Sequence, residues 1–343
     1  MKSKAIPFPQ VPRSRWRPSR WAAYFFERKA GLFHPSGHPT NAKQVRRKVI
    51  GAFLTHPSEF FACMVFLFFI LLSLITWGLG RQWALESLRY SLLYGTGWFL
   101  WMTYAAFFMP SSSRFLQFLR GFGPWVAVML SYNWVRFLIP AVHPSRFDAA
   151  FRNSEIGLWG EESAFWTRAL AGHPYWTDLF CLFYLALFFW MFGMLFYYAF
   201  IRHPLYQRFM LGLMVLYMGG FAGYMVFPAA GPRYAFHQEW DWLNGGTFFR
   251  LTNLIVSHMG AKLDVFPSLH AAIAIYLLLW QADHHRWQVA WGLPLAVGIW
   301  VSTIYLGFHY FPDIVGGGIL GALGFFLAPR LEQKAQKLKE RWS

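Results

Sequence analysis

Two histidine-containing segments near the end of the chain have the residue types that phosphoryl transfer needs. The first reads FPSLHAA over residues 266–272 and opens an apolar stretch, with Pro267 suited to the first turn of a helix. The free N–H groups of such a turn bind anions, and the Ser268 hydroxyl can donate to a phosphate oxygen. His270 lies within one turn of them, so the pattern predicts a phosphate site beside an imidazole.

The second segment reads STIYLGFHYFPD over residues 302–313 and pairs an imidazole with a carboxylate. His309 and Asp313 are four residues apart, which is one helical turn or one tight connection, so the carboxylate can reach the ring. An imidazole held in this way can act as a nucleophile or as a general base. We expect folding to bring His270 and His309 together around one phosphorus-sized gap, with Asp313 behind the second ring.

A third segment, PAAGPRY over residues 228–234, supplies positive charge, and its glycine and prolines favour a fixed turn. Arg233 is then placed to form paired hydrogen bonds with phosphate oxygens. Lys262, a few residues before the FPSLHAA segment, can add a second positive charge. No acidic cluster of the kind that favours bound magnesium accompanies these residues, so the expected site uses no metal and no cofactor.

In order and content, the three segments resemble the signature segments of the type 2 phosphatidic acid phosphatase superfamily, which contains membrane phosphatases and phosphotransferases. In that family a Pro-Ser-x-His segment precedes a segment of Ser-Arg, five residues, His, three residues and Asp. The positions that match here are Pro267, Ser268 and His270, followed at the family's spacing by Ser302, His309 and Asp313. The resemblance covers about residues 225–320 at the level of motifs.

Two departures point to one branch of that family. Thr303 stands where many members have arginine, and Gly231-Pro232-Arg233 stands in place of an earlier Lys-x6-Arg-Pro segment. With these departures, FPSLHA and HYFPD look most like the inositol phosphorylceramide synthase branch, whose members pass a phospho-head group from a phospholipid to a lipid alcohol. The resemblance therefore favours a lipid phosphotransferase over a plain phosphatase.

The resemblance also implies a role for each site residue. His309 would attack phosphorus and become a phosphohistidine, with Asp313 holding its tautomer. His270 would protonate the leaving oxygen and then deprotonate the acceptor. The non-bridging phosphate oxygens would be held by the helix N-terminus, Arg233, Ser268 and Lys262.

Two other functions stay open on the sequence. With water as the acceptor, the same residues make a lipid phosphate phosphatase of the phosphatidic acid or polyprenyl phosphate type. A non-catalytic transporter or scaffold would use the histidine pair as a proton relay or keep it as a relic. The motif HPSGH at residues 34–38 is closer to the commonest form of the family motif, but no apolar span begins there, so we interpret it as a turn.

The elements that position these residues are predicted to be membrane helices. The chain has 343 residues, of which 56% are hydrophobic and only 13% charged, and this charged share is too low for an ordinary soluble domain. Repeated apolar stretches of about 20 residues can each cross a bilayer as a helix. We predict an all-α, polytopic bundle of about eight spans, at residues 60–79, 90–109, 121–140, 178–200, 209–228, 266–282, 289–308 and 312–329. The glycines at 316–318 predict close helix packing.

Charge predicts the orientation of this bundle. The net charge is +16, and lysine and arginine concentrate at the two ends and in the connections on their side of the membrane. The positive-inside rule then puts both termini in the cytoplasm and the site at the periplasmic or lumenal face, in a bacterial inner membrane or a eukaryotic secretory membrane.

The predicted divisions of the chain follow from this orientation. They are a basic tail at residues 1–57, a membrane domain at 58–330 with its catalytic core at about 121–330, and a short basic tail at 331–343. Two interpretations of the first tail stay open: an interfacial helix that rests on an anionic lipid surface, or a solvated, partly disordered segment. Because the positive residues lie beside apolar spans, the expected partners are membrane lipids and not nucleic acid, and the sequence leaves the oligomeric state open.

Overall fold

The computed structural model describes residues 56–107, 114–161, 168–170, 173–200, 205–259 and 262–342. Within these ranges the chain folds into α-helices joined by short 3₁₀ turns and loops, which confirms the predicted all-α class. The predicted basic tail at residues 1–57 lies outside the described residues except at its end, where the first described helix begins at Pro57. The HPSGH motif also lies outside them.

Long helices occupy each of the predicted span regions in the described part of the chain. They are α3 (Pro57–Gly78), α4 (Ala84–Phe107), α5 (Arg114–Val142), α8 (Pro174–Phe200), α9 (Tyr206–Val226), α12 (Leu269–His284), α13 (Val289–Tyr305) and α14 (Phe311–Trp342). The connections between them contain α6 (Asp148–Trp159), α10 (Pro232–Ala235), η1 (His237–Trp240), α11 (Thr247–Met259) and η2 (Arg286–Gln288).

Six segments in the described ranges are long and apolar enough to cross a membrane, so the chain is an integral, multi-pass membrane protein. They are Pro57–Gly78, Phe118–Val142, Pro174–Phe200, Tyr206–Val226, Arg286–Tyr305 and Phe311–Leu338. The predicted number of eight is therefore approximate. At 16 residues, α12 is about 24 Å long, shorter than a hydrocarbon core of about 30 Å. α4 is long enough but is less apolar than α3, because it contains charged residues such as Glu86 and Arg89.

Two helix boundaries differ from the predicted spans. The third span was predicted at residues 121–140, but α5 begins at Arg114 and runs through Gly123 and Pro124. The absence of a side chain at Gly123 lets Trp101 of α4 approach, since a Cβ there would lie 2.9 Å from the indole nitrogen. α14 continues to Trp342, so residues 331–342, predicted as a short tail, extend the last helix.

The centre of the bundle is α12, which packs against α8, α9, α13 and α14. Small residues permit these close approaches. A Cβ at Gly317 of α14 would lie 2.3 Å from the Ser268 carbonyl oxygen, and one at Gly321 would lie 2.4 Å from the Ala272 carbonyl oxygen. The backbone of α14 therefore touches the backbone of α12, as the packing interpretation of the glycines at 316–318 predicted.

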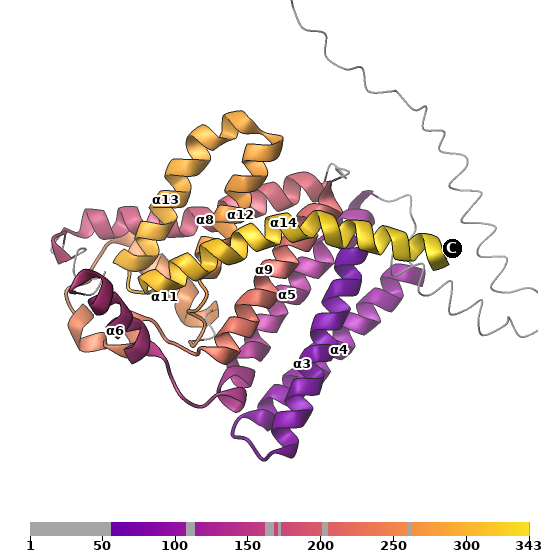
Figure 1. Ribbon diagram of the computed structural model, residues 1–343, viewed down its shortest axis with the longest axis horizontal. Helices are drawn as coiled ribbons and strands as arrows, with labels where there is room; N and C mark the ends of the chain where they lie inside the picture. Colours follow the sequence, from indigo (N-terminus) through magenta and orange to yellow (C-terminus); the bar gives the residue numbers. More distant parts are fainter. Residues whose placement is uncertain are drawn as a thin grey trace, which may run out of the picture. The chain divides into compact units, whose positions relative to one another are not determined.

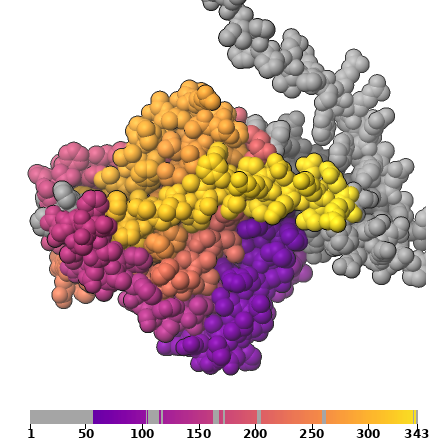
Figure 2. Space-filling model, viewed as in Figure 1, coloured from indigo at the N-terminus to yellow at the C-terminus, as the bar shows by residue number. Residues whose placement is uncertain are grey.

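Apart from η2, which joins the end of α12 to α13, the short helices of the connections gather at the end of the bundle where α12 and α14 begin. Figure 1 shows α6 and α11 at this end, on the left, with the C-terminus of α14 at the other end. Figure 2 shows α14 crossing the visible face, with the α6 region at its N-terminal end, and these two helices are in contact. This end of the bundle contains the candidate site.

Candidate active site

The structure brings together the two histidines and the aspartate that the sequence singled out. His270 Nδ1 lies 3.3 Å from His309 Nε2, with the ring planes at 64°. On the other side of the second ring, His309 Nδ1 lies 3.6 Å from Asp313 Oδ2. His309 is 3% exposed and Asp313 is fully buried. Since the carboxylate faces Nδ1, the tautomer with a proton on Nδ1 leaves the Nε2 lone pair directed toward His270.

The start of α12 positions His270. Ser268 is the N-cap of this helix, and its hydroxyl oxygen accepts a hydrogen bond of 3.2 Å from the Ala271 amide. The Ser268 amide donates to the Asp313 carbonyl oxygen at 3.0 Å, which ties α12 to the first turn of α14. We expected Pro267 in the first helical turn, but the helix begins at Leu269 and the proline precedes the cap.

The loop from α13 to α14 positions His309. Gly307 adopts a left-handed φ of +67°, and the amides of Phe308 and His309 both donate to the Thr303 carbonyl oxygen, at 2.9 and 3.2 Å. Asp313 Oδ2 accepts a hydrogen bond of 2.8 Å from the Tyr310 amide. One carboxylate therefore fixes the loop and faces the imidazole.

Thr303 does not supply the charge that many family members have at its position. Its side chain is fully buried, and its hydroxyl donates to the Trp300 carbonyl oxygen of the same helix at 2.8 Å. The departure seen in the sequence is therefore also a difference in the site, because this position presents no cation to a phosphate group.

Arg233 reaches the same loop from the connection after α9. Its amide donates to the Gly307 carbonyl oxygen at 2.9 Å, and its Nη1 donates to Asn253 Oδ1 of α11 at 2.9 Å. The guanidinium carbon lies 5.1 Å from the centre of the Phe249 ring and 5.9 Å from that of Phe308. Burial lowers the pKa of Arg233 from its ordinary value, but a guanidinium remains charged at neutral pH.

The other two predicted phosphate-binding residues are less clearly placed for that role. The Ser268 side chain is fully buried and its oxygen caps α12, although the hydroxyl hydrogen is not used in that bond. Lys262 is exposed with a φ of +65°, and no hydrogen bond or ion pair between described residues joins it to the histidine pair. Binding of phosphate by either residue stays a prediction.

The two imidazoles are closer together than we expected. In-line transfer places the attacking atom and the leaving oxygen on opposite sides of phosphorus, which requires about 6 Å between the ring nitrogens. At 3.3 Å they can share a hydrogen bond but cannot hold a phosphorus atom between them. One ring must turn to admit the substrate, and His270 has more room because it is only partly buried.

Two acidic residues on α6 contact the site loops but were not predicted from the sequence. Asp148 and Glu155, both at most 5% exposed, bond to the segments that contain Arg233 and His309. They lie in a connection between spans, far from the motifs. Their spacing of seven residues, which places both on one face of a helix, was the signal that could have found them.

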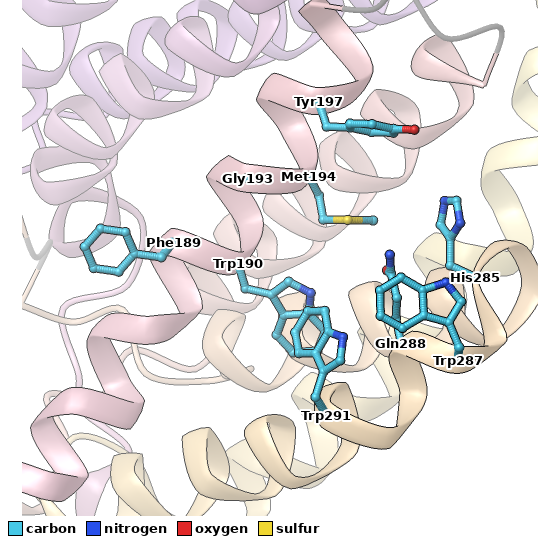
Figure 3. Close-up of a pocket in the computed structure, with 9 residues that line it drawn as sticks. All are labelled: Phe189, Trp190, Gly193, Met194, Tyr197, His285, Trp287, Gln288 and Trp291. Atoms are coloured by element: carbon cyan, nitrogen blue, oxygen red, sulfur yellow. The ribbon is translucent and has the colours of Figure 1, made fainter.

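An aromatic cavity lies at the other end of α12 from the histidine pair. It has a volume of about 490 Å³ and is lined by the C-terminal half of α8 and by residues that follow α12. Figure 3 shows Trp190 of α8 beside Trp291 of α13, with His285 and Trp287 nearby. The ring centres of Trp190 and Trp291 are 5.5 Å apart. Because His285 follows the last turn of α12 and His270 lies in its first, this cavity is not part of the candidate site.

The acidic, histidine and cysteine side chains of the described ranges do not gather into a metal centre. Within these ranges, no group of three or more histidine, cysteine, aspartate and glutamate side chains is placed to hold a metal ion.

The sequence of the chain is similar to a known protein family and to a bacterial enzyme. The family model of the PAP2 superfamily matches residues 155–327, about half of the chain, a range that includes His270, His309 and Asp313. The phosphoinositol dihydroceramide synthase of Bacteroides thetaiotaomicron is 30% identical over 230 residues, which cover 59% of this chain and 73% of that protein. No solved structure matches the chain.

Proposed function

The chain belongs to the PAP2 superfamily, as a membrane enzyme of its lipid phosphotransferase and phosphatase class, and from this premise we propose that it moves a phospho-head group from a phospholipid to a lipid alcohol. The observation that carries the proposal is the placement of His309 between His270 and Asp313. The bacterial relative favours a transferase acting on a ceramide-type acceptor, because its name describes a synthase of phosphoinositol dihydroceramide.

The first half of the proposed reaction uses the two faces of the His309 ring. Nε2 attacks phosphorus as the bond from phosphorus to the leaving lipid oxygen breaks, giving a phosphohistidine. Asp313, 3.6 Å from Nδ1, holds that nitrogen protonated and stabilises the positive charge that develops on the ring. His270 in its protonated form donates its proton to the leaving oxygen.

The second half reverses these roles. His270, now neutral, takes the proton of the acceptor hydroxyl as its oxygen attacks phosphorus and the N–P bond breaks. This returns His309 to its starting form and His270 to its protonated form, so the cycle closes without another reactant. Water in place of the lipid alcohol would release the phosphorylated head group, or free phosphate from a monoester, which is the phosphatase reaction of the same family.

Charge on the phosphate group is balanced from two sides in this proposal. Arg233 approaches over Phe308, one residue before His309, and supplies the cation that Thr303 lacks. The first amides of α12 and the Ser268 hydroxyl approach from the His270 side, with the positive end of the helix dipole toward the anion. Lys262 adds positive charge at the edge of the proposed site. Fixed donors around a transferring phosphoryl group usually contribute most of the stabilisation of its transition state.

The family assignment also bears on the alternatives left open by the sequence. Membership of an enzyme superfamily and likeness to a synthase favour an enzyme over a non-catalytic transporter or scaffold. The choice of acceptor separates the remaining two functions, and product analysis can decide it.

The test is incubation of the purified full chain with phospholipids labelled in the head group, with and without ceramide. We expect a labelled ceramide phosphodiester that forms only when ceramide is present, together with an equal amount of diacylglycerol. His309→Ala should abolish this product, whereas His38→Ala, in the HPSGH motif, should leave it unchanged. Release of labelled head group or free phosphate without an acceptor would instead identify a phosphatase, and no turnover of any lipid would count against an enzyme.

A further inference from the structure

Asp148, the first residue of α6, is a buried carboxylate that the proposed reaction does not use. It is 5% exposed, and α6 lies in the connection between α5 and α8. A carboxylate at this depth is costly unless hydrogen bonds compensate its charge. Its bonding partners therefore indicate what it does in the fold.

The Asp148 carboxylate joins two segments that are far apart in the sequence. Its Oδ1 accepts hydrogen bonds from the amides of Ala230 and Gly231, at 2.9 and 3.0 Å. The same oxygen accepts a hydrogen bond of 3.0 Å from the Tyr310 hydroxyl. Oδ2 adds a longer contact of 3.2 Å to the Ala230 amide. One oxygen atom thus binds donors from both segments.

Each of these segments contains a residue of the proposed site. Gly231 is two residues before Arg233, and Tyr310 directly follows His309. The two segments also touch each other, because the Arg233 amide donates to the Gly307 carbonyl oxygen. At Gly231, where φ is +87°, an added Cβ would lie 2.5 Å from the Phe308 carbonyl oxygen. The separation between the arginine and the histidine therefore depends on this junction.

The rest of α6 keeps Asp148 in place. Glu155, two helical turns further on the same face, accepts a hydrogen bond from the Phe311 amide. On the outer side, Arg152 makes a paired contact with Glu239 of η1, with both N–O distances 3.0 Å. The Phe147 amide donates to the Pro228 carbonyl oxygen at 2.8 Å, just before the segment that Asp148 binds.

We propose that Asp148 is a positioning residue that holds the Arg233 segment and the His309 loop at the separation a single phosphate group requires. This inference rests on the proposed function, since it assumes that Arg233 and His309 act on the same phosphate. Asp148 itself does not touch the substrate. It acts through the Gly231 amide on one side and the Tyr310 hydroxyl on the other.

The first experiment compares two substitutions in the purified full chain. Asp148→Ala removes every bond and leaves two buried amides without a partner, so we expect kcat to fall about 100-fold, the loss typical of a nucleophile misplaced by about 1 Å, while KM changes much less. Asp148→Asn keeps a carbonyl oxygen at the position of Oδ1, so it should recover most of that loss. Ser154→Ala, at an exposed position of the same helix, is the control and should behave like the natural chain.

A second experiment separates positioning from general stability. If Asp148 acts through the Arg233 segment, its substitution should cost much less kcat when Arg233 is already alanine than when it is intact. Equal losses in the two backgrounds, or a loss explained wholly by the fraction of unfolded protein, would overturn the inference. If Asp148→Ala does not fold, Tyr310→Phe can be used instead, because it removes only one of the hydrogen bonds. We expect Tyr310→Phe to lower kcat with a smaller effect on folding. An unchanged kcat in this variant would also contradict the inference.

These outcomes are distinct from failure of the proposed function. If the natural chain forms no labelled lipid product, the proposed function fails. If the natural chain is active, His309→Ala is inactive and the Asp148 variants retain full kcat, only the inference about Asp148 fails.

Discussion

Arg233 brings a positive charge to the His309 loop. Thr303 brings none, although many members of the family have an arginine at its position. Arg233 is held by Asn253 and its guanidinium lies near the rings of Phe249 and Phe308, so this group is positioned before a substrate arrives. Pre-ordered donors lose less conformational entropy on binding a phosphate group than free ones do. In the proposed reaction, Arg233 would balance the charge on the phosphate from the α10 side of the site.

At the residue scale, we predict that Arg233→Lys lowers kcat/KM about 100-fold. Lysine keeps the charge but has neither the planar pair of donors nor the ring contacts of arginine. Thr303→Val should stay within about threefold, because the threonine hydroxyl bonds only to its own helix. The measurement is steady-state lipid transfer with thermal unfolding in parallel. Full activity of Arg233→Lys, or an equal loss in Thr303→Val at unchanged stability, would contradict the assignment.

At the scale of elements, the site depends on contact between the first turns of α12 and α14. The Ser268 amide of one helix bonds to the Asp313 carbonyl oxygen of the other, and this bond sets His270 against His309. Gly317 keeps the two helices close enough for that bond. The next residue, Gly318, has no atom within 4 Å of the position its Cβ would occupy. The helix contact therefore leaves no room for a side chain at Gly317, whereas it leaves room for one at Gly318.

We predict that Gly317→Ala destabilises the protein by about 1–3 kcal/mol, because the new methyl group would overlap the Ser268 carbonyl oxygen and push α14 away from α12. The activity of the folded fraction should fall too, since that shift changes the distance from His270 to His309. Gly318→Ala is the matched control and should be neutral or slightly stabilising. Thermal unfolding in detergent and transfer assays measure both effects. Similar behaviour of the two variants would mean that this helix contact does not position the site.

At the scale of the whole membrane domain, the site end and the C-terminal end of α14 are separated by the length of that helix. Lys262 precedes α12 at the site end, whereas Lys337 lies near the C-terminal end of α14, one residue before the apolar segment of that helix ends at Leu338. Both lysines are exposed. Charge in the sequence predicts that the first end faces the periplasm or lumen and that the second faces the cytoplasm.

We predict opposite labelling of cysteines placed at these two lysines. In sealed cells, an impermeant maleimide should label Lys262→Cys without permeabilisation and Lys337→Cys only after it. The natural cysteines, Cys63 and Cys181, are buried, and the unsubstituted chain serves as the background control. The reverse pattern would place the site on the cytoplasmic face, and labelling of both cysteines in sealed cells would contradict a crossing by α14.

Several features of this protein could be predicted from the sequence because they depend on local interactions. Apolar stretches form helices in lipid wherever the backbone must satisfy its own hydrogen bonds, so the helical regions follow from composition. His309 and Asp313 are close because they are only four residues apart, across the tight connection that leads into α14. The motif order identified the family, since the residue types and spacings lie within short segments. The position of Thr303 in its motif likewise showed that one charge was missing.

Other features depended on the tertiary structure because they join residues far apart in the chain. No local pattern specifies that Asp148 binds the Gly231 amide and the Tyr310 hydroxyl, since those contacts exist only once α6 lies against the site loops. The distance of 3.3 Å between the imidazoles follows from the packing of α12 on α14, and Ser268 became a cap because the helix began two residues later than Pro267 suggested. The sequence therefore determined which groups are present and which are neighbours along the chain, whereas packing between helices decided the distances on which their chemistry depends.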